Sequence, residues 1–273
     1  MTATALLKAR YGKLESQPEV PWNSTLAVLL NHRSVRAYLP DALPEGTLEL
    51  LVAAAQSAAS SSNLQVWSVV AVEDEGRKAR LAELSNGQTH IAQAPLFLVW
   101  LADLARLEKL LAERGIPKDE LNHLELTLVA AVDAALAAQN AVVAAESLGL
   151  GTVYIGALRN RIEEVAAELR LPPRAFPLFG LCVGYPDPVN PAAIKPRLPQ
   201  EAVLHREAYA LDGQGTAIDR YDRVMADFYR AQQMAVEGDW SDHSAQRVAT
   251  RRATSGQQKR LSEALRNLGF PLL

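Results

Sequence analysis

One long uninterrupted helix, predicted over residues 121–150, constrains this fold more than any other feature. The stretch contains no proline, and no glycine before Gly149, so nothing breaks a helix of about eight turns. Apolar residues go most of the way around it, as in a helix that is buried or crosses a membrane. Four polar or charged residues interrupt the run: Asp133, Gln139, Asn140 and Glu146. They argue against a membrane span, so we expect a buried central helix whose many alanines let neighbours, including a second subunit, approach closely.

The composition is that of a soluble globular protein. Hydrophobic residues make up 49% of the 273 residues and charged residues 22%, and the formal net charge of −3 gives no reason to expect nucleic acid or an anionic membrane as a partner. The single cysteine, Cys182, lies in an apolar run and is expected to be a small core residue. The first residues lack the pattern of a signal peptide, so a cytoplasmic location is expected.

Short strands separated by helices are predicted along the rest of the chain. Runs of valine and aromatic residues indicate strands at 67–74, 94–103, 152–156 and 176–184, the third directly after glycines 149 and 151 end the long helix. Capping and periodicity indicate helices at 24–31 (capped by Asn23 or Ser24), 43–58 (with Pro44 in its first turn), 75–87, 104–115 and 160–171, and two or three more after Glu201. The class is therefore α+β or α/β with helices dominating. Residues 1–22 are weakly patterned, and we assign them no role.

Two basic clusters are candidates for binding an anion. Residues 32–36, HRSVR, place two guanidiniums and a hydroxyl within five residues, and residues 195–197, KPR, hold two cations in a loop stiffened by proline. Arginine forks suit phosphate oxygens, and lysine supplies a compact charge. Each cluster alone is explained equally well as solvated surface charge.

Two tight turns, at 86–88 and 154–157, have backbone and amide groups that could contact a flat polar heterocycle. The serine cluster at 60–62 adds hydroxyl donors. The serine cluster is explained equally well as a plain loop that ends a helix. The five histidines show no metal-ligand spacing, so no metal site is expected. The usual phosphate-loop signatures are also missing from the sequence.

Taken together and in this order, these motifs make the chain resemble the FMN-dependent nitroreductase superfamily, and most closely its oxygen-insensitive nitroreductase and flavin reductase branch. The resemblance runs from about Ser24 to Trp240. It rests on these segments: HRSVR at 32–36, SSSNLQ at 60–65, NGQTHIAQAP at 86–95, the stretch 138–160, LFGLCVGYP at 178–186, KPRLP at 195–199 and WSDH at 240–243.

The resemblance implies an α+β, nitroreductase-like fold: a central, mainly antiparallel sheet surrounded by helices, in an intertwined homodimer with FMN at the interface. Residues 1–22 would be an N-terminal extension, and 23–273 a single FMN-binding domain with a helical extension from about 201. The implied FMN-binding residues are His32, Arg33, Ser34, Val35, Arg36, Lys195, Pro196 and Arg197 around the phosphate and ribityl chain, Ser60, Ser61, Ser62 and Gln88 at the flavin's polar edge, and Tyr154, Ile155, Gly156 and Ala157 near the ring. Val35, Asn63 and Ala157 stand where relatives vary, and Asn63 is a candidate for facing the substrate.

The implied activity is hydride transfer in a ping-pong sequence. NADH or NADPH reduces the flavin at N5, and an electron-poor acceptor such as a nitroaromatic or quinone is then reduced on the same ring. No catalytic side chain and no metal are implied. The alternatives are a flavin reductase that releases reduced FMN, a non-catalytic flavin-binding redox sensor, and a helical interaction domain without a cofactor.

The choice between the two nicotinamides is predicted from residues 231–239. The family's branch carries arginine just before WSDH, where it binds the 2′-phosphate of NADPH. Here the stretch AQQMAVEGD contains two acids and no base. We therefore expect the preference for NADPH to be weakened or reversed, unless flanking arginines compensate: Arg230, Arg247, Arg251 and Arg252.

Overall fold

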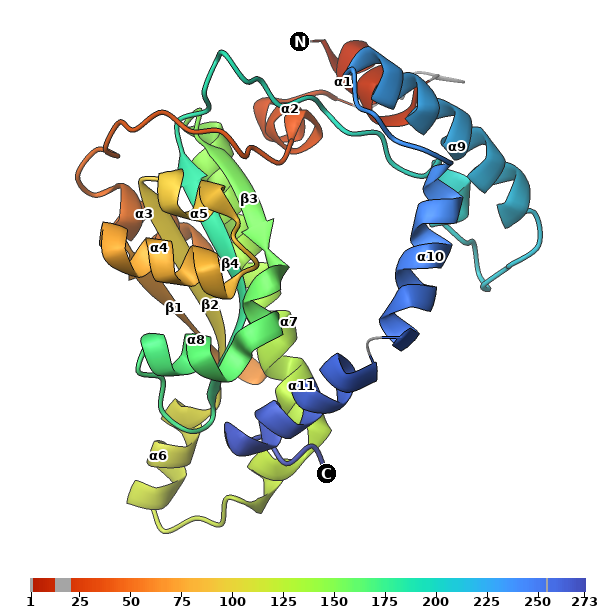
Figure 1. The fold of residues 1–273 in the computed structure, drawn as a ribbon. Helices are drawn as coiled ribbons and strands as arrows, with labels where there is room; N and C mark the ends of the chain where they lie inside the picture. Colours follow the sequence, from red (N-terminus) through yellow and green to blue (C-terminus); the bar gives the residue numbers. More distant parts are fainter. Residues whose placement is uncertain (1, 13–20, 254) are drawn as a thin grey trace. The chain divides into compact units, whose positions relative to one another are not determined.

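The computed structural model describes residues 2–12, 21–253 and 255–273, and these form two compact units (Figure 1). The first unit combines Met1–Arg33 with Ala193–Ser255, and the second combines Ser34–Ala192 with Gly256–Leu273. Both units are therefore assembled from segments that are distant in the sequence. The predicted division at residue 23 stays a prediction.

The second unit is built on a four-stranded sheet. Its strands are β1 (Trp67–Val72), β2 (Leu96–Asp103), β3 (Gly151–Ile155) and β4 (Ala175–Gly184), in the order β1-β2-β4-β3. All three pairings are antiparallel, which confirms the expected mainly antiparallel sheet. The first seven residues of β2 are buried, because helices cover both faces of the sheet.

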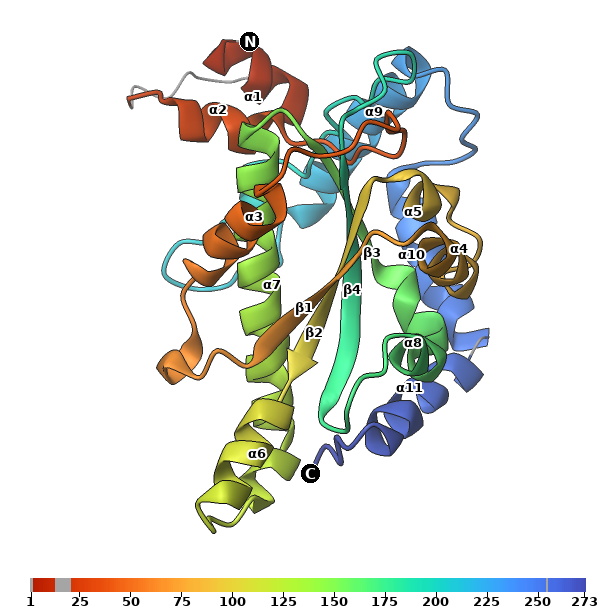
Figure 2. The same ribbon diagram turned by 90° about the vertical axis from the view of Figure 1, so that its left-hand side faces the viewer.

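Alternate residues of β2 enter two different hydrophobic cores, one on each face of the sheet. Leu98 and Trp100 pack with α3 (Thr47–Gln56) and α7 (Leu124–Ser147). Phe97 and Val99 pack with α4 (Glu75–Leu84), α5 (Thr89–Gln93) and α8 (Ile162–Glu168). Figure 2 shows these two groups of helices on opposite sides of the sheet. The strand period of two thus supplies both cores from a single apolar run.

Glycine at position 180 makes the close packing on β4 possible. A Cβ there would lie 2.2 Å from Cζ of Phe97, and that ring is fully buried. Cys182, two residues further along the same strand, is also buried, as expected for a small core residue.

The central helix α7 is 24 residues long, shorter than predicted, because the 3-10 turn η2 (Asp119–Asn122) precedes it. Its alanine-rich face is buried against the sheet. Its other face exposes a stripe of large apolar side chains at intervals of four residues: Leu124 (46% exposed), Leu128 (52%), Val132 (55%) and Leu136 (45%). The single chain therefore buries one face of the helix, and burial of the other face by a second subunit stays a prediction.

By length and composition α7 could cross a membrane. However, 44% of its most apolar 18-residue window is buried inside the structure, and the core helix of a soluble protein passes the same test. The alanines Ala134, Ala137, Ala138 and Ala141 are at most 1% exposed, which requires protein rather than lipid around that face.

The end of α7 differs from the prediction in one respect. Gly149 has φ +80° and ends the helix as expected, whereas Gly151 is the first residue of β3. A Cβ on Gly151 would lie 2.7 Å from Cγ2 of Val35. Glycine is needed there for packing rather than for helix termination.

The C-terminal residues complete the sheet unit. The helix α11 (Ser255–Asn267) leads to Phe270, which contacts Phe176 edge-to-face at 4.7 Å between ring centroids. Buried Arg174 donates to the carbonyl of Leu121 (2.8 Å) and to Oδ1 of Asn122 (2.6 Å), next to the start of α7. The remaining elements of this unit are α6 (Ala105–Glu113) and the 3-10 turns η1 (Ser61–Asn63) and η3 (Gly156–Arg161).

Two helix predictions in this unit need correction at their ends. Pro44 lies in the turn before α3, because Gly46, with φ +82°, is the N-cap of that helix. The segment predicted as a helix from residue 160 begins instead with η3, and its α-helix runs only over Ile162–Glu168.

The first unit is helical. It contains α1 (Ala3–Tyr11), α2 (Ser24–Asn31), η4 (Gln200–Ala202), α9 (Gln214–Ala231) and α10 (Trp240–Ala253). Asn23 caps α2 as predicted, since its Oδ1 accepts from the amide of Leu26 at 2.9 Å. The helix α1 is a correction, because residues 1–22 are only weakly patterned and no helix is predicted there. Residues 13–20 of that segment lie outside the described residues.

Candidate functional site

Residues 34–36 run beside strand β3 in an extended conformation. Ser34 forms a parallel bridge with Thr152, and the amide of Val35 donates to the Thr152 carbonyl at 2.9 Å. Val35 is 4% exposed, while Arg36, its neighbour in the chain, is exposed. The hydroxyl of Tyr38 donates to the Val35 carbonyl at 2.7 Å. Buried Val35 therefore fixes the segment, and the exposed side chain of Arg36 is available for a ligand.

The far end of β3 carries the second predicted group. Tyr154 is 38% exposed and contacts Phe179 edge-to-face, while Ile155 is buried in the core. Burial raises the pKa of the Tyr154 hydroxyl, so the phenol stays neutral at physiological pH. Gly156, which begins η3, is exposed, and Ala157 is half-buried. Exposed backbone at Gly156 is suited to contacts with a planar ring.

His90 is a candidate residue that lies within the NGQTHIAQAP segment but is not among the predicted FMN-binding residues. Burial, and then the charge of Arg36, lower the pKa of its imidazole, so the ring is neutral at pH 7. Its Nε2 is buried and has no hydrogen-bond partner among the described residues. A buried nitrogen without a partner is costly, and a ligand atom would satisfy it. Gln88, which precedes helix α5 as its N-cap residue, is half-buried.

The serine cluster forms a strained loop. Ser62, Asn63 and Gln65 all have positive φ, at 49°, 55° and 51°. Left-handed backbone is unfavourable for residues other than glycine, and such strain is typical of ligand-binding loops. Ser61, Ser62 and Asn63 are exposed.

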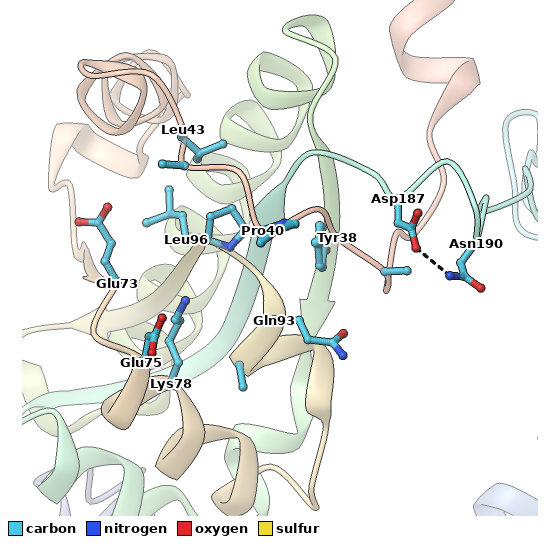
Figure 3. A pocket seen from close by; sticks show the side chains of 14 residues that line it. Tyr38, Pro40, Leu43, Glu73, Glu75, Lys78, Gln93, Leu96, Asp187 and Asn190 are labelled. Atoms are coloured by element: carbon cyan, nitrogen blue, oxygen red, sulfur yellow. Dashed lines mark hydrogen bonds between the residues drawn. The ribbon is translucent and has the colours of Figure 1, made fainter.

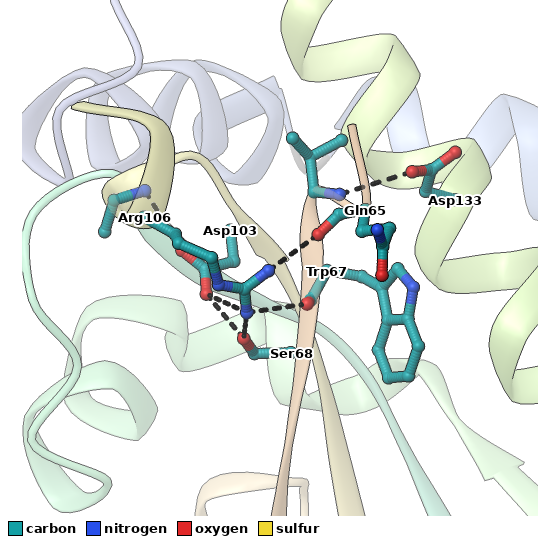
Figure 4. A network of polar contacts seen from close by, with 8 residues as sticks. Gln65, Trp67, Ser68, Asp103, Arg106 and Asp133 are labelled. Carbon is teal, nitrogen blue, oxygen red and sulfur yellow. Dashed lines mark hydrogen bonds and ion pairs between the residues drawn. The ribbon is translucent and has the colours of Figure 1, made fainter. Parts of the chain in front are cut away.

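Buried Asp133, in the middle of α7, holds this loop. Its Oδ2 accepts from the hydroxyl of Ser60 (2.6 Å) and from the amide of Val66 (3.3 Å), and its Oδ1 accepts from the amide of Ser61 (3.2 Å). Arg106 holds the end of the loop, since its Nη1 donates to the Gln65 carbonyl at 2.8 Å (Figure 4). The sequence signal for Asp133 is an acid in the middle of a mostly apolar helix, which by itself indicates only that the helix does not span a membrane.

The other predicted residues belong to the first unit. Nη1 of Arg33 donates to the carbonyl (3.1 Å) and to Oδ1 (2.8 Å) of Asn31. Pro196 is buried and its carbonyl accepts from the Tyr221 hydroxyl at 3.0 Å, while Lys195 and Arg197 on either side are exposed. Arg10 donates to the carbonyls of both His32 and Lys195, so the start of the first basic cluster, residues 32–33, lies close to the second cluster within this unit.

A cavity of about 630 Å³ lies elsewhere in the second unit, and none of the predicted site residues lines it (Figure 3). Buried Lys78 lies on its wall and donates to the Ala94 carbonyl at 2.7 Å. Three acids also line the cavity: Glu73, Glu75 and Asp187. The hydrogen bond from Asn190 lowers the pKa of Asp187, so that carboxylate is ionised at neutral pH. The excess of acids makes this cavity unsuitable for a phosphate.

The predicted site residues, in contrast, supply donors in each unit taken by itself. The first unit supplies cations for an anion: Arg33, Lys195 and Arg197. The second unit supplies Arg36, the orphaned nitrogen of His90, exposed serine hydroxyls and the exposed backbone at Gly156. Guanidinium and ammonium groups bind phosphate oxygens, and hydroxyl, imidazole and amide groups match a polar heterocycle.

Comparison with known proteins agrees with this chemistry. Residues 29–185 match the profile of the "Nitroreductase family", and residues 195–273 match that of the "Nitroreductase family, C-terminal domain". The chain is 39% identical over 224 residues to an FMN reductase (NADPH) of Bacillus subtilis, covering 81% of this chain and 89% of the relative. It is 42% identical over 221 residues to an oxygen-insensitive NADPH nitroreductase of Salmonella typhimurium, covering 80% and 88%.

A solved structure shows the same similarity in three dimensions. The NADPH:FMN oxidoreductase from Vibrio harveyi, complexed with NAD+, matches with a TM-score of 0.78 and 34% sequence identity. The match covers 91% of this chain and 99% of that chain.

Proposed function

Since the chain belongs to the nitroreductase family, we propose that it is an FMN-dependent oxidoreductase, which uses NADH or NADPH to reduce nitroaromatics, quinones or similar electron-poor acceptors. The observation that carries the proposal is the match of both family profiles across the segments that hold every predicted site residue. The names of the relatives, which are NADPH-dependent FMN reductases and nitroreductases, support the cofactor and the donor.

The proposed binding residues divide by the chemistry of their donors. Arg33, Arg36, Lys195 and Arg197 would bind the phosphate and the ribityl chain, together with the backbone of residues 32–35 and Pro196. Ser60, Ser61, Ser62 and Gln88 would donate to the polar edge of the flavin. The backbone from Tyr154 to Ala157 would contact the ring. To these we add His90, whose buried Nε2 lacks a partner among the described residues. Asp133 is proposed as a supporting residue, which holds the serine loop without touching the ligand.

The bound flavin supplies the hydride chemistry, and the protein supplies binding, orientation and charge. Arg36 or Lys195 would place positive charge against the flavin and so favour its reduced, anionic form. No side chain is proposed as nucleophile or general acid, and no metal is proposed. Because donor and acceptor use the same ring in turn, the two substrates would bind in a ping-pong sequence.

We also propose that the protein is a homodimer in the cytoplasm, without a nucleic-acid or membrane partner. The apolar stripe on α7 supports the dimer. Four large side chains spaced one helical turn apart are each at least 45% exposed in the single chain, and a soluble protein rarely leaves such a stripe in water. A second copy of α7 would cover it with the same residues, as two-fold symmetry allows.

The cofactor is tested by analysing the purified protein. We expect a yellow protein that releases FMN on denaturation, in a ratio approaching one flavin per chain. Colourless protein that takes up no flavin from solution would contradict the proposal.

The named FMN reductases among the relatives favour one second candidate, a flavin reductase that releases reduced FMN. It is distinguished by adding free FMN during donor oxidation. In a flavin reductase, free FMN acts as a saturable acceptor and dissociates from the enzyme in its reduced form. In a nitroreductase, a nitroaromatic acceptor is reduced by the bound flavin alone.

A further inference from the structure

The N-terminal helix α1 carries one buried charged side chain, Arg10, which is 7% exposed. Its Nη2 donates to the carbonyls of Leu30 (3.1 Å) and His32 (2.9 Å), and its Nη1 donates to the carbonyl of Lys195 (2.9 Å). The carbonyl of Arg10 accepts from the amide of Arg197 at 2.8 Å. One residue therefore holds both basic segments.

The contacts with Leu30 and His32 fix how the first segment leaves helix α2. Leu30 is in the last turn of α2 (Ser24–Asn31), where carbonyls have no partner within the helix. A guanidinium there satisfies such a carbonyl and also interacts favourably with the negative end of the helix dipole. His32 is the first residue of the HRSVR segment, so the same guanidinium sets the direction in which Arg33 continues.

The contacts of Arg10 with the second segment are made through the backbone of that segment. They join Arg10 to the carbonyl of Lys195 and to the amide of Arg197, two residues that are exposed. The carbonyl of buried Pro196 between them accepts a hydrogen bond from the Tyr221 hydroxyl of α9. Nη1 of Arg197 also donates to the carbonyls of Lys195 (3.2 Å) and Pro196 (3.3 Å). The backbone of this loop is therefore held by contacts from α1, from α9 and from its own arginine.

The helix α1 is itself well anchored, which makes Arg10 a firm support. Thr2 caps it, Leu6 is 1% exposed, and a Cβ on Gly12, which has φ +80°, would lie 2.8 Å from Cγ2 of Val224 on α9. The chain leaves α1 pressed closely against a neighbouring helix, where only glycine fits.

We propose that Arg10 is a positioning residue, which holds residues 32–33 and the KPR loop at the spacing required to bind one phosphate group. Arg33, Lys195 and Arg197 repel one another before a ligand binds, so the loops that carry them would separate without a brace. Fixing them in advance lowers the free energy lost on binding. This inference rests on the proposed function, in which that phosphate belongs to FMN.

The test compares FMN with riboflavin, which has the same ring but no phosphate. Each flavin is titrated into the flavin-free full-length protein, and binding is followed by quenching of flavin fluorescence. The Arg10→Gln variant removes the guanidinium that donates to the carbonyls of Leu30, His32 and Lys195. Lys8→Gln is the matched control, because it removes the same charge from an exposed position on the same helix.

We expect Arg10→Gln to weaken FMN binding about ten- to a hundred-fold, the scale of a lost hydrogen bond to a charged group. Riboflavin affinity should change less than about threefold, and Lys8→Gln should leave both affinities within about twofold. If Arg10→Gln fails to fold, Arg10→Lys replaces it; lysine keeps the charge but cannot reach three carbonyls, so FMN should again lose more affinity than riboflavin.

Two results would overturn the inference. FMN binding unchanged in the folded Arg10 variant would show that the brace is not needed, and an equal loss for both flavins would show a general structural role. Either result leaves the proposed function intact. A wild-type protein that binds neither flavin would contradict the proposed function and the positioning role together.

Discussion

At the scale of single residues, the candidate site depends on a buried acid that is not itself expected to touch a ligand. Asp133 is 2% exposed and accepts three hydrogen bonds from the serine loop, which contains three residues with positive φ. Without that carboxylate the strained backbone would relax and its amides would lose their acceptor. The loop geometry is therefore linked to one side chain of α7.

We predict that Asp133→Ala lowers the free energy of unfolding by about 2–4 kcal/mol, as is typical when a buried hydrogen-bond network loses its central acceptor. Urea unfolding measures this. Glu125→Ala, at an exposed position on the same helix, should change stability by less than about 0.5 kcal/mol. Equal effects from the two substitutions would show that the network contributes little.

His90 gives a prediction about pH. Because burial and Arg36 lower its pKa in the folded protein, the unfolded chain binds a proton to this group more readily than the folded chain does. Stability of the flavin-free protein should therefore fall as pH drops from above about 6.5, the ordinary pKa of histidine, toward the lowered folded value.

The measurement compares urea midpoints at pH 7.5 and 5.5 for the wild type and for His90→Gln. The wild type should lose more stability between these two pH values than the variant, which lacks the group. The other histidines are common to both proteins and cancel in the comparison. An identical pH dependence in the two proteins would contradict the account of His90.

At the scale of elements, helix α7 serves the fold with one face and, we propose, the dimer with the other. Its alanine face packs on the sheet, and its stripe of Leu124, Leu128, Val132 and Leu136 is exposed in the single chain. A substitution in the stripe should therefore affect association and leave folding of the chain largely unchanged.

We predict that Val132→Lys converts a dimer into a monomer at micromolar concentration, observed by size-exclusion chromatography with light scattering. Loss of a buried valine costs about 1.5–3 kcal/mol, or about ten- to a hundred-fold in the dissociation constant, before the burial of charge is added. Ser147→Lys, at an exposed position near the end of the same helix, should stay dimeric. A monomeric wild type that contains FMN would refute the dimer.

The connection between α9 and α10 bears on the choice of nicotinamide. Asp222 on α9 caps α10, since its carboxylate accepts from the amide (3.0 Å) and the hydroxyl (2.6 Å) of Ser241. The loop between these helices carries Glu237 and Asp239, and the nearest arginine, Arg230, forms an ion pair with Asp227 at 3.2 Å. The acids of the loop would repel a 2′-phosphate.

A charge-assisted hydrogen bond to the 2′-phosphate would contribute about 1.5–3 kcal/mol, or about ten- to a hundred-fold in affinity, and this loop has no cation to make it. We therefore predict that kcat/KM for NADPH exceeds kcat/KM for NADH by much less than about a hundred-fold, or falls below it. Both donors are compared with one saturating acceptor. A preference for NADPH of about a hundred-fold would show that flanking arginines supply the phosphate site.

At the scale of the whole molecule, local sequence patterns predicted helices and strands better than they predicted contacts between residues that are distant in the sequence. The apolar runs gave all four strands, and the Asn23 cap gave the start of α2, because those signals depend on neighbouring residues. Helix α1 was missed because its contacts come from distant residues: Arg10 meets Lys195, and Gly12 meets Val224. The packing of residues 256–273 with the sheet was missed for the same reason.

The sequence motifs predicted the segments of the candidate site, but they did not predict the residues that hold those segments in place. Ser34, Val35 and Tyr154 belong to recognisable segments, and the structure places the first two beside the strand that carries the third. Asp133 and Arg10 hold these segments from elsewhere in the chain, and no spacing along the sequence connects them to the loops they support. His90 lay within a recognised segment, but its orphaned nitrogen is visible only in three dimensions.

Steady-state oxidation of NADPH or NADH with a nitroaromatic acceptor and no added flavin shows whether the enzyme turns over on bound FMN. We expect continued oxidation of many donor equivalents per chain, with parallel double-reciprocal plots as the acceptor is varied. A single bleaching of the bound flavin that the acceptor does not reverse would contradict it, since the protein would then bind flavin without catalysis.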